Sequence, residues 1–194
     1  MRYIRVRNGK ILQISQNPIQ ATSPTDRIYS LNIDHNYVVL QDDGTPRPMT
    51  EQEIDDYHQM QFNKAKSNLT LLIHQKRKQL ENLGITLHTS AGDYIVDTSQ
   101  IGRSNLQGTI LTYEIGNLDK TSDAVPWKFE NGFLELNYNQ LKEISAFVTD
   151  YIEKLFLAEK QHYDAIEQLT TIEEIQNYDL DQFWPSNEYN SQTI

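Results

Sequence analysis

Residues 125–166 read VPWKFENGFLELNYNQLKEISAFVTDYIEKLFLAEKQHYDAI, and this stretch decides the expected fold. Its first part is two short apolar runs joined by Asn131-Gly132. That dipeptide between strand formers is a strong hairpin signal, because a two-residue type I′ turn needs positive φ at both central residues. We therefore expect Gly132 to adopt positive φ. A two-stranded ribbon is marginally stable alone, so one of its faces should rest on a helix or another strand.

The second part of the stretch predicts one long helix over residues 138–165. Asn137 and Gln140 can form a capping box, and apolar side chains then recur every three or four residues. The ribbon that carries Trp127 is expected to close over this helix. The predicted buried face consists of Leu141, Ile144, Val148, Tyr151, Leu155, Ala158, His162, Ala165 and Leu169.

Residues 1–49 predict a small β-rich domain. Apolar residues flank Asn8-Gly9, which predicts a first hairpin. Residues 28–33 and 37–41 offer two more strands, joined through the short turn between them. Pro46 and Pro48 are expected to end the sheet, since proline fits neither a ladder nor a helix interior.

A connecting helix is predicted over residues 50–83, because Thr50 and Glu53 can form a capping box and Gly84 ends the pattern. Its narrow apolar stripe suits a core helix and a seam against a partner equally well. The basic cluster at residues 76–78 is expected on a solvated helix face rather than in a nucleic-acid patch. The candidate oligomer seam consists of Phe62, Ala65, Leu69 and Leu72.

Residues 84–185 predict an α+β C-terminal domain, so the chain as a whole is expected to be α+β. It should begin with a hairpin around Ala91-Gly92, followed by a helix that Asp97 or Thr98 can cap. Gly108 weakens that helix and is expected to mark a close helix–helix approach.

The C-terminal end predicts a short helix followed by a tail. Thr170 and Thr171, followed by two glutamates, form a helix N-terminal signal. Residues 186–194 are expected to be a free tail.

Composition and charge exclude several classes of function. Lys and Arg number 17 against 27 Asp and Glu, and the net charge of −10 argues against binding nucleic acid through a basic face. There is no cysteine for disulfides or thiolate metal sites. No apolar run has the length of a signal peptide or a membrane span. We expect a soluble protein made in a cytoplasm, without membrane or nucleic-acid partners.

The sequence contains no motif that indicates a catalytic, cofactor-binding or metal-binding residue. We therefore expect that the protein is not an enzyme. The five histidines are scattered, and Asp119-x-Thr121-x-Asp123 lacks the glycine that a calcium loop needs. His162 is expected to be a hydrogen-bonded core residue. The two tryptophans are expected to anchor a core rather than to stack on a sugar or base. The predicted structural anchors are Trp127, Gly132, Leu141, Val148, Tyr151, Leu155 and Trp184.

Four segments occur in an order that resembles a family of phage tail-region domains. They are GDYIVDTSQIGRSNLQG, PWKFENGFLEL, the long helix and TTIEEIQNYDLDQFWP, together spanning about residues 92–185. This family is known as a domain of unknown function that is commonly encoded beside tail-fibre genes. The chain departs from it at Asn137, where Thr is usual, and at Tyr178, where Ile is usual. The front half of the chain, with its hairpin and the segment VVLQDDGTPRPMTEQE, is similar to the openings of many phage tail and tail-fibre accessory proteins.

The resemblance implies a structural protein of a phage tail, at the tail tip, the baseplate or the fibre base. Its partners would be baseplate, fibre or tail-tube proteins, with self-association into a homo-oligomer as a further expectation. It would be made in the host cytoplasm and reside in the virion, with no catalytic residues and no cofactor. An alternative is a tail-fibre assembly chaperone that is absent from the mature virion. A third is a carbohydrate-binding tip module that would use Trp127, Trp184 and the tyrosines.

Overall fold

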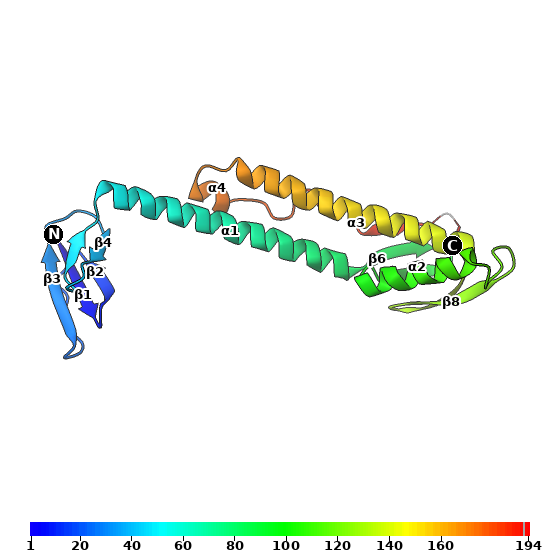
Figure 1. Cartoon of the computed structure of the whole chain (residues 1–194), viewed down its shortest axis with the longest axis horizontal. Helices are drawn as coiled ribbons and strands as arrows, with labels where there is room; N and C mark the ends of the chain where they lie inside the picture. Colours follow the sequence, from blue (N-terminus) through cyan, green and yellow to red (C-terminus); the bar gives the residue numbers. More distant parts are fainter. Residues whose placement is uncertain (192) are drawn as a thin grey trace. The chain divides into compact units, whose positions relative to one another are not determined.

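A computed structural model describes residues 1–191 and 193–194, and it confirms the α+β class (Figure 1). The chain forms two compact units, residues 1–64 and 65–194. Their boundary falls inside one continuous helix, α1 (Glu51–Leu83), and not at either of its ends. The second half of the predicted connecting helix is therefore part of the C-terminal unit.

The N-terminal unit contains two small antiparallel sheets, and in the larger one β1 is the central strand. The β1–β2 turn is the predicted hairpin, with positive φ at both Asn8 and Gly9. Ile4, Val6 and Val38 form its small core. The five strands are β1 (Arg2–Arg7), β2 (Lys10–Ser15), β3 (Asp26–Leu31), β4 (Val38–Leu40) and β5 (Pro46–Pro48).

The expectation that Pro46 and Pro48 lie outside any ladder is wrong. Both belong to β5, which pairs with β4 so that Arg47 lies opposite Val39. This small sheet has only two strands, so β5 is an edge strand, the one place in a sheet where proline is tolerated. The two strands expected at residues 28–33 and 37–41 belong to different sheets, because β3 pairs with β1 while β4 pairs with β5.

The Thr50–Glu53 capping box at the start of α1 is confirmed. The Glu53 amide donates to Thr50 Oγ1, and the Thr50 amide donates to Glu53 Oε2. Glu53 also pairs with Arg47 at 2.6 Å. Hydrogen bonds from Arg47, and then from Thr50, lower the pKa of Glu53 to about 2.

Over its described residues, 65–191 and 193–194, the C-terminal unit contains the second half of α1, three further helices and five strands. Ser99 caps α2, in place of the predicted Asp97 or Thr98. Asn137 forms the capping box predicted for α3, and Thr171 forms a capping box where a helix N-terminal signal was predicted for α4. The elements are β6 (Ile85–Thr89), β7 (Gly92–Val96), α2 (Gln100–Glu114), β8 (Ala124–Phe129), β9 (Gly132–Asn137), α3 (Tyr138–Glu167), α4 (Ile172–Gln176) and β10 (Glu188–Asn190).

Within this unit, α1 and α3 lie side by side and antiparallel (Figure 1). Lys66 Nζ donates to the carbonyl of Glu167, and Tyr151 Oη donates to the carbonyl of Leu80. Between these two contacts, His74 Nδ1 lies 2.9 Å from Glu159 Oε1. Residue numbers rise along α1 from 66 to 80 while those of the contacting residues on α3 fall from 167 to 151, which shows that the two helices are antiparallel. Lys66 contacts Glu167, the last residue of α3, so the paired part of α1 begins near Lys66.

The four residues of the candidate oligomer seam differ in burial. Leu69 is only 5% exposed and is buried inside the C-terminal unit, while Leu72 on the same helix is 48% exposed. Phe62 and Ala65 are half-buried, and the unit boundary separates them. The true buried row on α1 is Leu69, Ile73 and Arg77, spaced by four residues. The four residues do not form one open seam.

The prediction that residues 76–78 lie on a solvated face is wrong for Arg77, which is 6% exposed. Its guanidinium pairs with Glu81 and, through Nε at 2.7 Å, with Glu159 of α3. It also lies over the ring of Phe156 at 4.5 Å. Arg103 of α2 pairs with the other oxygen of Glu81 at 2.9 Å. A buried network of charges thus joins three helices, and such groups are costly to bury unless paired.

The predicted free tail is also wrong, since Glu188–Asn190 forms β10 and pairs with β6 in parallel. Tyr189 stacks on Phe147 of α3 with ring centroids 4.0 Å apart. His88 of β6 lies 2.8 Å from Asp93 Oδ1 and 2.5 Å from Glu188 Oε2. The C-terminal strand is therefore held by backbone pairing, by aromatic packing and by a histidine between two carboxylates.

Gly108 does not mark a close approach, because a Cβ there would meet no atom within 4 Å. The tight position on α2 is Gly102, whose added Cβ would lie 2.3 Å from the carbonyl oxygen of Asp97. In the part of the chain that the structure describes, no helix is long and apolar enough to cross a membrane.

Two glycines of the C-terminal unit provide a matched pair of substitutions. Gly84 has φ +87°, and an added Cβ would lie 2.9 Å from the carbonyl oxygen of Val96. Gly84→Ala should lower the free energy of unfolding by about 2 kcal/mol or more. Gly108→Ala in an open helix position should raise it by roughly 0.5–1 kcal/mol. Urea denaturation of both variants measures this, and a neutral Gly84→Ala would contradict the described backbone.

The His88 contacts predict a dependence of stability on pH. Hydrogen bonds to Asp93 and then to Glu188 raise the pKa of His88 above its usual 6.5. A raised pKa means that the protonated histidine stabilises the folded state below about pH 6.5, and this contribution is lost as pH rises through the folded pKa. Melting temperatures of wild type and His88→Gln should differ most near pH 5–6, below the usual pKa of a histidine. A difference that grows toward pH 8 would refute the assignment.

Candidate functional site

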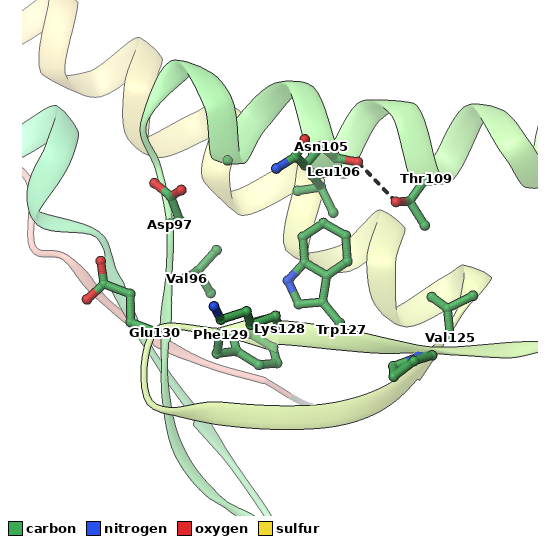
Figure 2. A pocket seen from close by; sticks show the side chains of 12 residues that line it. Val96, Asp97, Asn105, Leu106, Thr109, Val125, Trp127, Lys128, Phe129 and Glu130 are labelled. Atoms are coloured by element: carbon green, nitrogen blue, oxygen red, sulfur yellow. Dashed lines mark hydrogen bonds between the residues drawn. The ribbon is translucent and has the colours of Figure 1, made fainter.

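A cavity of the C-terminal unit lies between α2 and β8, with a volume of about 640 Å³ (Figure 2). The end of β7 closes one side of it. It lies wholly within residues 65–194. Its lining consists of Val96, Asp97, Gly102, Asn105, Leu106, Thr109, Val125, Pro126, Trp127, Lys128, Phe129 and Glu130.

The β8–β9 hairpin, whose first strand borders the cavity, has a different turn from the one predicted. Phe129 pairs with Gly132, so the two turn residues are Glu130 and Asn131. Neither of them, nor Gly132, has positive φ, and the expectation of a type I′ turn at Asn131-Gly132 is wrong. A Cβ on Gly132 would meet only Tyr94, at an ordinary 3.5 Å. Gly132 is therefore not required by backbone conformation.

The side chain of Asn131 explains this turn. Its Oδ1 accepts from the Ile95 amide at 3.0 Å, and its Nδ2 donates to the Asp93 carbonyl at 2.9 Å. The Glu130 amide also donates to the Ile95 carbonyl, at 3.2 Å. The Asn131 carboxamide thus makes, with the outer edge of β7, the hydrogen bonds that the backbone of a neighbouring strand would make. These three bonds with β7 hold the hairpin tip and override the local preference of Asn-Gly.

Trp127 is half-buried and its ring stands on β8 facing α2, beside Leu106 (Figure 2). Its indole N–H donates no hydrogen bond to any residue that the structure describes. The expected contact of the hairpin with the long helix is made instead by Phe129 and Leu136, which share a core cluster with the buried face of α3. Trp127 contributes to the edge of this core and to the cavity wall.

Charged groups gather at one end of the cavity, where Asp97 and Glu130 lie away from Val125 (Figure 2). Asp97 Oδ1 accepts from the Ser99 amide at 2.8 Å. Among residues 1–191 and 193–194, neither carboxylate forms an ion pair, and Lys128 forms none either. The cavity therefore combines an aromatic wall with a local excess of negative charge.

The other predicted anchors lie in the core. Leu141, Val148, Tyr151 and Leu155 are buried along α3 in one core cluster, and all four pack against other core residues. Trp184 is half-buried, and its indole N–H donates to the Leu180 carbonyl at 2.8 Å. Trp184 does not line the cavity, so the structure does not bring the two tryptophans to one binding surface.

His162 is a hydrogen-bonded core histidine, as expected. It is fully buried, Nδ1 lies 2.8 Å from Tyr178 Oη, and Trp184 packs on its ring at 4.8 Å. Burial lowers the pKa of His162. In the described ranges, no group of three or more histidines and carboxylates is placed to hold a metal ion. The Asp119 carboxylate is used within its own loop, by Thr121 and Ser122.

A pair of truncations separates core packing from cavity lining. Phe129 is 2% exposed, so Phe129→Ala should cost about 3–5 kcal/mol of unfolding free energy. Trp127→Ala removes a half-buried ring that borders a cavity and should cost only about 1–3 kcal/mol. Chemical denaturation of the two variants tests this order. Equal losses would show that Trp127 is a core residue and that the cavity wall is packed.

Searches of curated proteins and of solved structures found no match. Residues 64–181 match a family model described as Domain of unknown function (DUF4376). The match begins within one residue of the start of the C-terminal unit and includes the cavity. Because the match covers more than half of the sequence, the chain belongs to the DUF4376 family.

Proposed function

We propose that this chain is a structural protein of a bacteriophage tail, at the tail tip, the baseplate or the fibre base. The phage assignment rests on the ordered resemblance of residues 92–185 to tail-region domains. In this role the protein works by contact with other tail proteins and by self-association, not by catalysis, and it needs no cofactor. Its place of action is the virion, after synthesis in the host cytoplasm.

The observation that carries the contact role is the open face of α2. Ile101, Leu111 and Ile115 are 72%, 56% and 64% exposed. Positions 101, 108, 111 and 115 follow the spacing of one face of a helix, and Gly108 leaves the middle of that face without a side chain. Large exposed apolar side chains that share a surface are typical of protein interaction sites. The opposite face of α2 is used internally, where Leu106 and Tyr113 are buried.

Mass spectrometry of purified complete particles tests the proposal. A structural component should be present in finished tails at a fixed ratio to other tail proteins. If the chain occurs in assembly intermediates but not in finished particles, it is an assembly chaperone and the structural role is refuted.

A triple variant tests the α2 face directly. Ile101→Ser, Leu111→Ser and Ile115→Ser together should leave the fold intact, since these side chains are exposed, and should abolish incorporation into particles. Phe133→Ser is the matched control, because Phe133 is 65% exposed but lies on β9. Normal incorporation of the triple variant would remove the observation on which the contact role depends.

A further inference from the structure

The edge of β8, and not one of its faces, borders the cavity. Successive side chains of a strand point to opposite faces, so a cavity over one face touches every second residue. Here residues 125–130 all line it without a gap. Six consecutive lining residues indicate that the strand presents its backbone edge to the cavity.

The pairing register shows which backbone groups lie on that edge. In a hairpin with a two-residue turn, the pair that flanks the turn is hydrogen-bonded and every second pair after it is too. In the β6–β7 hairpin this rule leaves Asp93 and Ile95 facing outward, and these are the residues whose backbone bonds Glu130 and Asn131. The rule therefore holds in this molecule.

Applied to β8 and β9, the same rule pairs Phe129, Trp127 and Val125 with β9 by hydrogen bonds. The N–H and C=O of Lys128 and the C=O of Pro126 then point away from β9. Pro126 fits this reading, since it has no N–H to offer at a position that would not use one. No bond to another backbone group involves Lys128 on that side within the described chain.

β7 begins to cover this edge and then leaves it. The Glu130 amide bonds the Ile95 carbonyl, so continued pairing would bring Asp97 opposite Lys128. Ser99 instead caps α2, and the chain turns away over the cavity. A third strand therefore lies beside the hairpin at Glu130, but no third strand that the structure describes lies beside β8 from Lys128 toward Val125. The helix α2 covers this open edge and contributes Asn105, Leu106 and Thr109 as the opposite wall of the cavity.

We propose that this groove binds an extended peptide segment of a partner protein, which adds to β8 as a strand and carries a basic side chain at the Asp97–Glu130 end. Strand addition uses main-chain bonds for affinity and side-chain pockets for specificity. The bonds would be made to Lys128 N–H and C=O and to Pro126 C=O. An apolar side chain of the peptide fits beside Trp127 and Leu106, and the two carboxylates without ion pairs favour lysine or arginine.

This inference deepens the proposed function, because it rests on the premise that the chain acts through protein contacts, but its test requires no viral particle. The probe is a set of dye-labelled eight-residue peptides with Lys, Glu or Ser at the third position and Phe, Val or Ser at the fifth or sixth. Binding to the full chain is measured by fluorescence anisotropy. The Lys peptides with Phe or Val should saturate, and their Glu counterparts should bind at least about tenfold more weakly.

A single-tryptophan protein locates the bound peptide. Trp127 and Trp184 are the two tryptophans of the chain, so Trp184→Phe leaves Trp127 as the only indole reporter. The peptide that saturates should shift the emission of Trp127 in this variant with the same midpoint as the anisotropy. An unchanged emission spectrum at saturation would place the peptide elsewhere and overturn the proposal.

Two substitutions at one position separate backbone from side chain. Lys128→Pro removes the outward N–H, as Pro126 already does two residues earlier, and should weaken binding at least about tenfold while the β9 pairing remains. Lys128→Ala is the matched control and should bind within about twofold to threefold of wild type. Circular dichroism melting verifies that both variants fold. Equal affinities of the two variants would refute strand addition.

A charge reversal provides a second test that leaves β8 itself unchanged. Glu130→Lys should weaken the Lys peptides at least about fivefold and leave the Ser peptides unaffected. Failure of every peptide to saturate below about 1 mM would overturn the proposal. So would binding of an oligosaccharide on a glycan array that Trp127→Ala abolishes, because the groove would then be a sugar site. Neither result would bear on the presence of the chain in particles.

Discussion

The packing of α3 against α1 is the interaction on which the C-terminal unit depends. α3 contributes ten buried residues from Leu141 to Ile166, and elements from both ends of the unit meet it. α1 pairs with it in antiparallel register, Phe129 and Leu136 of the hairpin join its core, and Tyr189 of β10 stacks on Phe147. The apolar face of one helix is thus shared by segments about a hundred residues apart in sequence.

The charge network around Arg77 sets how α1 can lie on α3. A purely apolar contact between two long helices tolerates sliding, because leucine and isoleucine pack in many registers. A buried guanidinium within ion-pair distance of Glu81 and Glu159, with Arg103 on the far oxygen of Glu81, favours the register in which these charges face one another. Moving α1 by one turn would leave buried charges without partners, which costs several kcal/mol.

Most signals encoded within a few residues agree with the structure, although Ser99 caps α2 in place of Asp97 or Thr98. The Asn137 capping box, the Asn8-Gly9 turn and the predicted buried positions of α3 from Leu141 to His162 depend on neighbours close in sequence and are confirmed. At the end of that face Ala165 and Leu169 are only half-buried, and Ile166 is buried instead. The larger failures depend on tertiary partners. Asn131 bonds β7, and the hairpin therefore does not adopt the turn that the Asn-Gly dipeptide prefers. Arg77 is buried because Glu81 and Glu159 pair with its charge. The cavity was not predicted, because it exists only where β7 departs from β8. The local sequence feature that points to it is Pro126, since proline within a strand is typical of an unpaired edge.

The parallel strand at the C-terminus has a consequence for synthesis of the protein. Thr86 of β6 pairs with Glu188, so the outer edge of β6 is closed by residues made about a hundred positions later. At about 5–20 residues per second, a ribosome takes on the order of 5–20 s to supply them. Throughout that interval the nascent chain presents an open strand edge on which another nascent chain can pair. An unpaired strand edge of this kind is a site at which chains can pair wrongly, and β10 removes it once the C-terminal residues have been made.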